Sequence, residues 1–351
     1  MKKPSTPFPT TGYYGPEYFC DRTRELESLT RNIRGGTSTT LVALRRMGKT
    51  ALIRHLQYEM KNDHMGVYVD ILPTESMLDL LNSLATGIAA MVPEKSPPGA
   101  KVWKFLKSLR PVVSYDALSG MPTLSFNQGA EEGLKSIGEL FEFLEQQKYP
   151  VILAIDEFQQ ILSYQEKHMD ALLRSKIQEL KNVRFVFSGS QQHLINEIFA
   201  DPSRPFYRST QFLKLGKIGR EAYHPFIANK FRDHSKNIAD NTIESVLDWT
   251  EGYTYYVQLL CNRIFLSSGR QVHPELWKEE ALRLLKEQEF VFYSYREGLT
   301  SNQWGLLKAV AREGMVREPT SGAFISRHQL GSSATVLRAL ATLQKKELVY
   351  R

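Results

Sequence analysis

A Gly-Lys-Thr triplet between an apolar strand and an amphipathic helix restricts the fold of this chain more than any other feature. The run TTLVAL (39–44) is short, apolar and rich in β-branched residues, and TALIRHLQYEM (50–60) has helical spacing. Gly48, Lys49 and Thr50 lie where the two segments meet. This order of strand, loop and helix matches the phosphate-binding pattern G-x-x-x-x-G-K-[ST], apart from its first glycine. The junction therefore predicts a loop that binds the phosphates of a nucleotide.

A pair of acidic residues supplies the second half of such a site. Asp156 and Glu157 directly follow five apolar residues, 151–155, which suit a strand covered on both faces. There, Asp156 would orient Mg²⁺ together with Thr50, and Glu157 would polarise the attacking water. A strand capped by solvent-facing acids is the ordinary alternative. Since the acids come about a hundred residues after the triplet, with strand-helix units between, we favour a nucleotide site with Lys49, Asp156 and Glu157 as catalytic residues.

Alternating strands and helices predict an α/β fold with a mostly parallel sheet and right-handed crossovers. Residues 1–18 are an irregular lead-in, and the strands end before residue 219. The predicted elements of this part are helices at 22–33, 75–91 and 130–147, strands at 66–71 and 183–190, a Pro-rich break at 92–101, and an inserted hairpin at 111–127 with a turn at Ser119-Gly120.

The rest of the chain is predicted to be helical. The segment 302–351 contains three helical stretches, NQWGLLKAVARE, SRHQLG and SATVLRALATLQKKE, and ends in LVY, which would suit the start of a strand. The helical patterns before it occupy about 219–234, 241–250, 254–267 and 274–298.

Composition excludes some classes of protein. The 351 residues are 42% hydrophobic, without an apolar run of about 18 residues, so we expect no membrane span. The two cysteines lack metal-ligand spacing, and we expect a reduced, cytoplasmic protein. The net charge of +7 fits either a polyanionic partner or basic residues scattered over solvated faces, and we weight the second reading more.

Several motifs together resemble the archaeal-type ATPases of the STAND branch of AAA-like P-loop NTPases. Beside ALRRMGKT (43–50), the chain carries FCDRTREL (19–26), LAIDEFQ (153–159), FSGSQ (187–191) and EGYTYYVQLL (251–260). The resemblance also takes in FYRST and the C-terminal helices, and so covers nearly the whole chain. It implies the α/β fold of ASCE-type P-loop NTPases, in which helices sandwich the parallel sheet. It also implies an ATPase core at 1–218, a helical lid at 219–299 and a winged-helix-like domain at 300–351, with ATP and Mg²⁺ as ligands.

The resemblance also implies which residues form the site. Ser188 and Ser190 are candidate sensors of the γ-phosphate, although a plain strand-to-helix turn explains them equally well. Arg208 would reach a phosphate in cis or from a neighbouring subunit, or else is a surface arginine. Arg45 and Arg46 would touch phosphates or, with more weight, pack on the outer side of the loop. The nucleotide-binding residues would be Phe19, Arg22, Arg46, Met47, Gly48, Lys49, Thr50 and Ala51.

Three positions depart from the family pattern. Asp21 and Ala43 each stand in place of a glycine, and Thr254 stands where the family commonly has proline. Ala43 is tolerable if its φ is below zero, whereas a positive φ would strain it by about 1–2 kcal/mol.

The leading hypothesis is an ATPase that works as a nucleotide-driven conformational switch, with a protein partner or a second copy of the chain as candidate partners. The alternative is a non-hydrolysing, nucleotide-gated DNA-binding or scaffold protein. In a winged helix, the third helix would present Arg338, Lys345 and Lys346 to a major groove. Such domains also serve as lids or protein-interaction modules, and we do not favour DNA as the partner.

The first testable prediction concerns Ala43. Because Gly48 and the following helix N-terminus supply the close approach to phosphate, Ala43→Gly should change nucleotide affinity by less than about tenfold, or roughly 1.4 kcal/mol. The added backbone entropy of the unfolded chain should cost the apo fold about 0.5–1 kcal/mol. Titrating both proteins with a labelled nucleotide measures the change. A hundredfold gain in the glycine variant, about 2.7 kcal/mol, would mean that the natural loop is a decayed site.

Overall fold

The chain forms two compact units, Met1–Trp277 and Lys278–Arg351. The sequence places the start of the last domain at residue 300, whereas the second unit already begins at Lys278. Within the described residues, no helix is both long and apolar enough to cross a membrane. The computed structural model describes residues 3–91, 97–117, 120–127 and 129–350.

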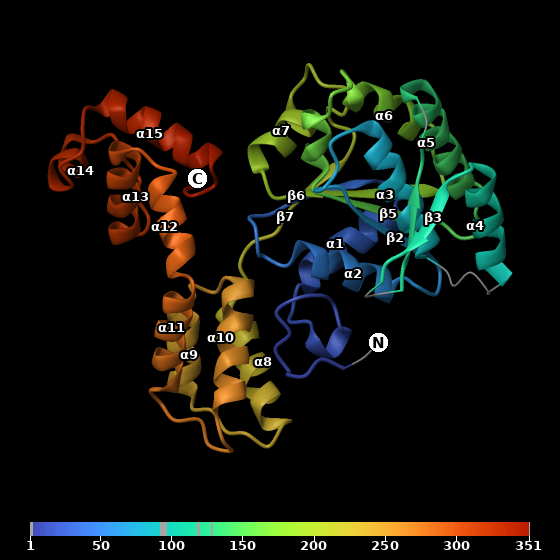
Figure 1. Cartoon of the computed structure of the whole chain (residues 1–351). Helices are drawn as coiled ribbons and strands as arrows, with labels where there is room; N and C mark the ends of the chain where they lie inside the picture. The colour runs from blue at the N-terminus through green and yellow to red at the C-terminus, as the bar shows by residue number, and fades with distance from the viewer. Residues whose placement is uncertain (1–2, 92–96, 118–119, 128, 351) are drawn as a thin grey trace. The chain divides into compact units, whose positions relative to one another are not determined.

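A five-stranded sheet in the spatial order β2-β5-β6-β1-β7 organises the first unit, and all its neighbouring strands are parallel (Figure 1). Every residue of β1 and β5 is buried, as expected for strands covered on both faces. The predicted α/β class is confirmed. The strands are β1 Thr39–Val42, β2 Met65–Asp70, β5 Val151–Asp156, β6 Val183–Gly189 and β7 Gln211–Lys214.

Helices pack on both faces of the sheet and form two separate cores (Figure 1). Along β5, Ile152 and Ala154 belong to the core that contains α1 and α2, whereas Leu153 and Ile155 belong to the core on the other side. This alternation follows from the two-residue period of a strand. The first core includes α1 Thr23–Arg34 and α2 Lys49–Glu59, and the second includes α3 Met77–Ala89, α4 Pro97–Ser108, α5 Ala130–Glu145, α6 Met169–Ile177 and α7 Gln192–Ala200.

The predicted hairpin is present as β3 Val112–Tyr115 paired antiparallel with β4 Pro122–Ser125. Its β4 strand is fixed to α3, because the Leu124 amide donates to the Thr86 hydroxyl. Ser119 of the predicted turn lies outside the described residues.

The predicted break at 92–101 is wrong in its second half, because α4 begins at Pro97; residues 92–96 lie outside the described part of the chain. Proline is tolerated in the first turn of a helix, where its missing N–H would have no intrahelical partner. Buried Val102, Trp103 and Leu106 recur at helical spacing behind it.

Besides α4, one strand and two α-helices of this unit were not predicted: β7, α6 and α7. The strand β7 has only four residues, and three of them are exposed, so it lacks the apolar run of a buried strand. The two helices have nine residues each, which is short for a periodic signal. Two 3-10 helices complete this unit, η1 Pro16–Tyr18 and η2 Phe158–Ser163.

The first three helices predicted for the lid lie at the expected positions, and α10 Thr254–Ser267 holds the irregular lead-in. Phe8 is fully buried, and the Asn262 amide donates to its carbonyl oxygen at 2.9 Å and to the Thr6 hydroxyl at 2.7 Å. These helices are α8 Arg220–Arg232, α9 Asp240–Trp249 and α10, followed by α11 Leu276–Glu287, which runs past the end of the unit.

The second unit has its own core, which includes Leu306, Phe324 and Leu343. The segment 274–298 contains two helices, α11 and α12 Glu289–Glu297, where the sequence predicted one. The predicted helix SATVLRALATLQKKE corresponds to α15 Ser333–Lys345. Within the described residues, LVY forms no strand: Leu348 and Val349 instead pack against the core. The other helices are α13 Ser301–Glu313 and α14 Gly322–Arg327. The helix predicted for SRHQLG (326–331) is wrong after Arg327, where α14 ends.

Close packing of α3 on β2 leads to a test of the fold. A Cβ atom at Gly87 would lie 2.7 Å from Val69 Cγ2 and 3.2 Å from the Tyr68 carbonyl oxygen, whereas one at Gly133 in α5 would meet nothing closer than 3.8 Å. Gly87→Ala should therefore lower the free energy of unfolding by about 1–3 kcal/mol through overpacking. Gly133→Ala should raise it by up to about 1 kcal/mol, because alanine favours a helix. Urea denaturation of both variants measures the difference, and equal effects would contradict this packing.

Candidate functional site

The loop between β1 and α2 has the backbone shape of a phosphate-binding loop. Gly48 is the N-cap of α2 and has φ 91, a left-handed value that glycine adopts without strain. No side chain caps the helix, so the N–H groups of its first turn face the loop. Ala43 is fully buried and is not among the residues with positive φ. The methyl group of Ala43 therefore adds no backbone strain, and alanine is tolerable at this position.

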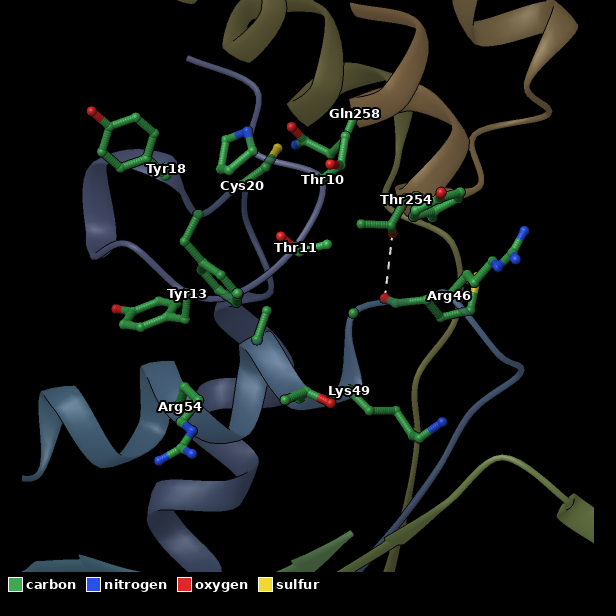
Figure 2. Close-up of a pocket in the computed structure, with 18 of the residues that line it drawn as sticks. Thr10, Thr11, Tyr13, Tyr18, Cys20, Arg46, Lys49, Arg54, Thr254 and Gln258 are labelled. Carbon is green, nitrogen blue, oxygen red and sulfur yellow. Dashed lines mark hydrogen bonds between the residues drawn. The ribbon is translucent and has the colours of Figure 1, made fainter. Parts of the chain in front are cut away.

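Backbone carbonyls of the loop are held by residues from the start of α1 and of α10. Met47 O accepts hydrogen bonds from Arg22 Nη2 at 3.1 Å and from the Thr254 hydroxyl at 3.3 Å. Arg46 O accepts from the Tyr255 amide at 3.1 Å. Figure 2 shows the bond from Thr254 at the start of the lid helix down to the loop. The first turn of α10 is thus bonded directly to the phosphate loop.

The Arg46 side chain extends the same contact. Its guanidinium lies 4.7 Å from the centre of the Tyr255 ring and donates to the Tyr256 hydroxyl at 3.0 Å. The Arg46 guanidinium therefore packs against the first turn of α10, while the residue also lines the cavity described below. The Arg45 guanidinium donates instead to the Ser190 hydroxyl at 3.4 Å.

Lys49 and Glu157 meet at the end of the loop. Lys49 is 7% exposed, and its Nζ lies 3.7 Å from Glu157 Oε1. Glu157 Oε2 is held on the other side by Gln159 Nε2 at 2.6 Å, by the Ser190 hydroxyl at 2.8 Å and by the Ser190 amide at 3.1 Å. One carboxylate oxygen is therefore fixed by three donors, while the other faces the lysine.

The Asp156 carboxylate is 4% exposed and accepts four hydrogen bonds. Oδ2 accepts from the Thr50 hydroxyl at 2.9 Å and from the Tyr68 hydroxyl at 2.7 Å. Oδ1 accepts from the Ser188 hydroxyl at 2.5 Å and from the Glu157 amide at 3.1 Å. These contacts join α2, β2, β5 and β6 at the carboxyl edge of the sheet.

A cavity of about 810 Å³ opens beside these groups. Figure 2 shows Lys49 on one side and Tyr13, Cys20 and Gln258 on the other. On that second side the Phe19 ring stacks on His55 at 4.2 Å between centroids, and the Tyr13 hydroxyl lies 2.6 Å from His55 Nδ1. Such a cavity, polar at one end and aromatic at the other, suits a ligand that joins phosphates to a flat base.

Burial and charge shift the pKa values of several groups around the cavity. Burial lowers the pKa of His55, which favours the neutral ring between Phe19 and Tyr13. Burial raises the pKa of the Cys20 thiol to about 12. The pKa of Asp70 is raised by burial and by the negative charges of Asp156 and Glu157, against the opposing effect of Lys49.

The structure brings most of the predicted site residues together. Asp156, Ser188 and Ser190 are not among the cavity-lining residues, but Asp156 bonds to Thr50, Ser188 bonds to Asp156, and Ser190 bonds to Glu157. Arg208 lies outside the described cavity lining: its guanidinium rests 5.1 Å from the Tyr207 ring centre, and its amide donates to Phe199 O. The predicted residues that line the cavity are Phe19, Arg22, Arg46, Met47, Gly48, Lys49, Thr50, Ala51 and Glu157.

Sequence reasoning missed two groups of residues. The first is the wall formed by the lead-in, for which only the Gly- and Tyr-rich composition of residues 1–18 gave a signal. The second group consists of side chains whose role depends on contacts between elements that are distant in the chain. No local sequence pattern predicts such contacts. The missed cavity residues include Thr10, Thr11, Tyr13, Arg54, Tyr223, Tyr255 and Gln258, and the missed partners of the acidic pair are Tyr68 and Gln159.

The donor set fits a magnesium ion bound with a nucleotide. A hydroxyl at Thr50 and a carboxylate at Asp156, 2.9 Å apart, are the protein groups that P-loop sites offer to the ion and its waters. Within the described residues, no group of three or more His, Cys, Asp or Glu side chains is placed to hold a metal alone. Magnesium usually binds through one or two protein carboxylates together with waters and phosphate oxygens, and a single carboxylate beside a hydroxyl fits that pattern.

Comparison of folds gives several similar structures. The Walker-type ATPase of Pyrococcus abyssi aligns with a TM-score of 0.70 at 17% identity, over 97% of this chain and 93% of that chain. The ORC2 protein of Aeropyrum pernix, solved as ADPNP-ADP complexes, aligns with a TM-score of 0.59 at 13% identity, over 95% and 88%. The ORC1 protein of the same organism, solved in complex with DNA, has a TM-score of 0.50 at 13% identity, over 94% and 85%. At these identities the likeness shows a shared fold.

Sequence comparison identifies two regions of the chain. Curated protein sequences give no significant match. Residues 281–351 match the family described as a probable winged helix domain. This match begins close to Lys278, where the second compact unit begins. Residues 19–260 match the family described as an ATPase domain predominantly from Archaea, and this match spans the phosphate loop, the acidic pair and the lid contacts. Because that match covers most of its length, the chain belongs to this archaeal-type ATPase family.

Proposed function

We propose that this protein is a Mg²⁺-dependent ATPase that works as a nucleotide-driven conformational switch. The observation that carries the proposal is the meeting of two distant segments: Lys49 and Thr50 at the start of α2 contact Glu157 and Asp156 at the end of β5. Phosphoryl transfer needs mainly positioning and charge stabilisation, and these four groups supply both.

In the proposed reaction, each residue acts at a defined place. The first-turn amides of α2 and Lys49 bind the β- and γ-phosphates. Magnesium, when bound, neutralises charge that develops on the phosphate oxygens. When Lys49 turns to the phosphates, Glu157 Oε1 loses its 3.7 Å partner and is left to accept a proton from the attacking water. The three donors on Oε2 keep the carboxylate in place during this change.

The lid contacts support the switch part of the proposal. The Thr254 hydroxyl and the Tyr255 amide bind carbonyls of the same loop whose amides would hold the phosphates. A loop that tightens on a phosphate moves both sides of its peptide groups, since each peptide is planar. We therefore expect occupancy of the loop to alter these lid contacts, and hydrolysis to restore them.

The alternative function is a protein that binds nucleotide without hydrolysing it and acts as a DNA-binding or scaffold protein. Along α15 and at its C-cap, Arg338, Lys345 and Lys346 are exposed, as a DNA-contacting helix would need, but exposed basic residues are also typical of solvated faces. Retained nucleotide binding without turnover would favour this alternative.

Replacing Lys49 tests the phosphate loop. Lys49→Ala removes the main cation that faces the β- and γ-phosphates, so the nucleotide-induced rise in melting temperature should disappear. For the wild type, that rise corresponds to about 2.7 kcal/mol at a nucleotide concentration of 100 Kd. The exposed Lys104 on α4 offers the control, because Lys104→Ala removes the same charge outside the cavity. A full shift in Lys49→Ala would show that the nucleotide does not use this loop.

Replacing Glu157 tests hydrolysis. Glu157→Gln keeps the shape of the side chain but removes the charge that activates water, so phosphate release should fall by about 10²–10⁴-fold with nucleotide affinity retained. Glu142→Gln, at an exposed position of α5, should leave turnover unchanged. If Glu157→Gln turns over as fast as the wild type, Glu157 is not the base; if neither protein releases phosphate, the alternative without hydrolysis is correct.

A further inference from the structure

The carboxylate of Asp156 has an unusual set of partners. Its two oxygens accept from three hydroxyl groups, those of Thr50, Tyr68 and Ser188, and from one backbone amide. A carboxylate has about four lone-pair sites, so the group is fully hydrogen-bonded although it is nearly buried. Thr50 belongs to the phosphate loop and Ser188 to the candidate sensors, whereas no role has been given to Tyr68.

Tyr68 is fixed from several sides. It lies in β2, opposite Ala154 of β5 in the parallel register, and its ring packs against the core that contains α2. The Arg54 guanidinium from α2 covers the ring at 4.1 Å. The preceding residue of the strand is held as well, because Gln57 of α2 donates to Val67 O at 2.8 Å. The hydroxyl is therefore presented to Asp156 by a rigid strand and not by a mobile loop.

We propose that Tyr68 is a positioning residue of the metal site, whose hydroxyl holds Asp156 Oδ2 in the orientation that recruits Mg²⁺ to the bound nucleotide. This inference rests on the proposed function. Thr50 shares Oδ2 with Tyr68, and the Thr50 oxygen is also the group that the metal ion would contact. When Thr50 adjusts to the ion, Tyr68 is the donor that keeps this carboxylate oxygen in place.

A general property of metal sites fits this role. Partners that orient a metal-binding carboxylate act through that carboxylate, and they affect metal affinity more than they affect the fold. A purely structural tyrosine would contribute to packing and would leave metal affinity unchanged.

The test measures metal binding and not turnover. Mn²⁺ is titrated into the wild type and into Tyr68→Phe, each saturated with a non-hydrolysable ATP analogue, and free Mn²⁺ is followed by electron paramagnetic resonance. Tyr68→Phe should bind Mn²⁺ about 10-fold more weakly, because it loses a partner that orients the metal-binding carboxylate. Affinity for the analogue in EDTA should stay within about twofold, because the phosphate loop itself is untouched.

A matched control uses a second tyrosine with a hydrogen-bonded hydroxyl, the buried Tyr164. The Tyr164 hydroxyl lies 2.5 Å from the Thr74 hydroxyl, whereas the Tyr68 hydroxyl donates to Asp156, so Tyr164→Phe should leave Mn²⁺ affinity within about twofold of the wild type. Equal loss in both variants would overturn the assignment, and so would an unchanged or tighter affinity in Tyr68→Phe. If the wild type bound no analogue at all, the proposed function would fail; if it bound both ligands and Tyr68→Phe matched it, only the role of Tyr68 would fail.

Discussion

The hydrogen bond between the Thr50 hydroxyl and Asp156 Oδ2 joins the first turn of α2 to the end of β5, and the site depends on it. The two residues are far apart in the chain, but parallel strands bring their carboxyl ends to one edge of the sheet. Register decides which side chains arrive there. Since β5 is buried along its length and its alternate residues fill two different cores, a slip of one residue would exchange the two cores and turn Asp156 away.

The backbone at Glu157 adds a second constraint. Consecutive residues of a strand point to opposite faces, so two adjacent carboxylates would normally diverge. Glu157 instead has φ 56, a left-handed value that costs a non-glycine residue about 1–2 kcal/mol. This turn lets Glu157 face Lys49 while Asp156 faces Thr50. The three donors on Glu157 Oε2 help to hold the strained turn, and local strain of this kind is common at functional sites.

Sequence reasoning succeeded where a residue and its neighbours in the chain carry the signal. The triplet at 48–50, the acids after 151–155 and the lid helices all follow local patterns, and the structure has these elements at the expected places. It failed for elements with weak patterns, such as the exposed four-residue β7 and the helix α4 behind a Pro-rich run. It also could not find Tyr68, because its position in β2 is explained equally well by packing, and its contact with Asp156 exists only once β2 pairs with β5.

The central claim is that a nucleotide bound in the phosphate loop changes the contacts of the lid. The change would pass through the hydrogen bonds from Thr254 and Tyr255 to the loop carbonyls. Hydrogen–deuterium exchange, with and without a non-hydrolysable ATP analogue and Mg²⁺, tests it most directly, because exchange reports local opening of backbone hydrogen bonds. The account predicts a changed exchange rate at residues 46–52 and also at 253–258 of the lid. No change at either segment, or a change at the loop alone, would contradict it.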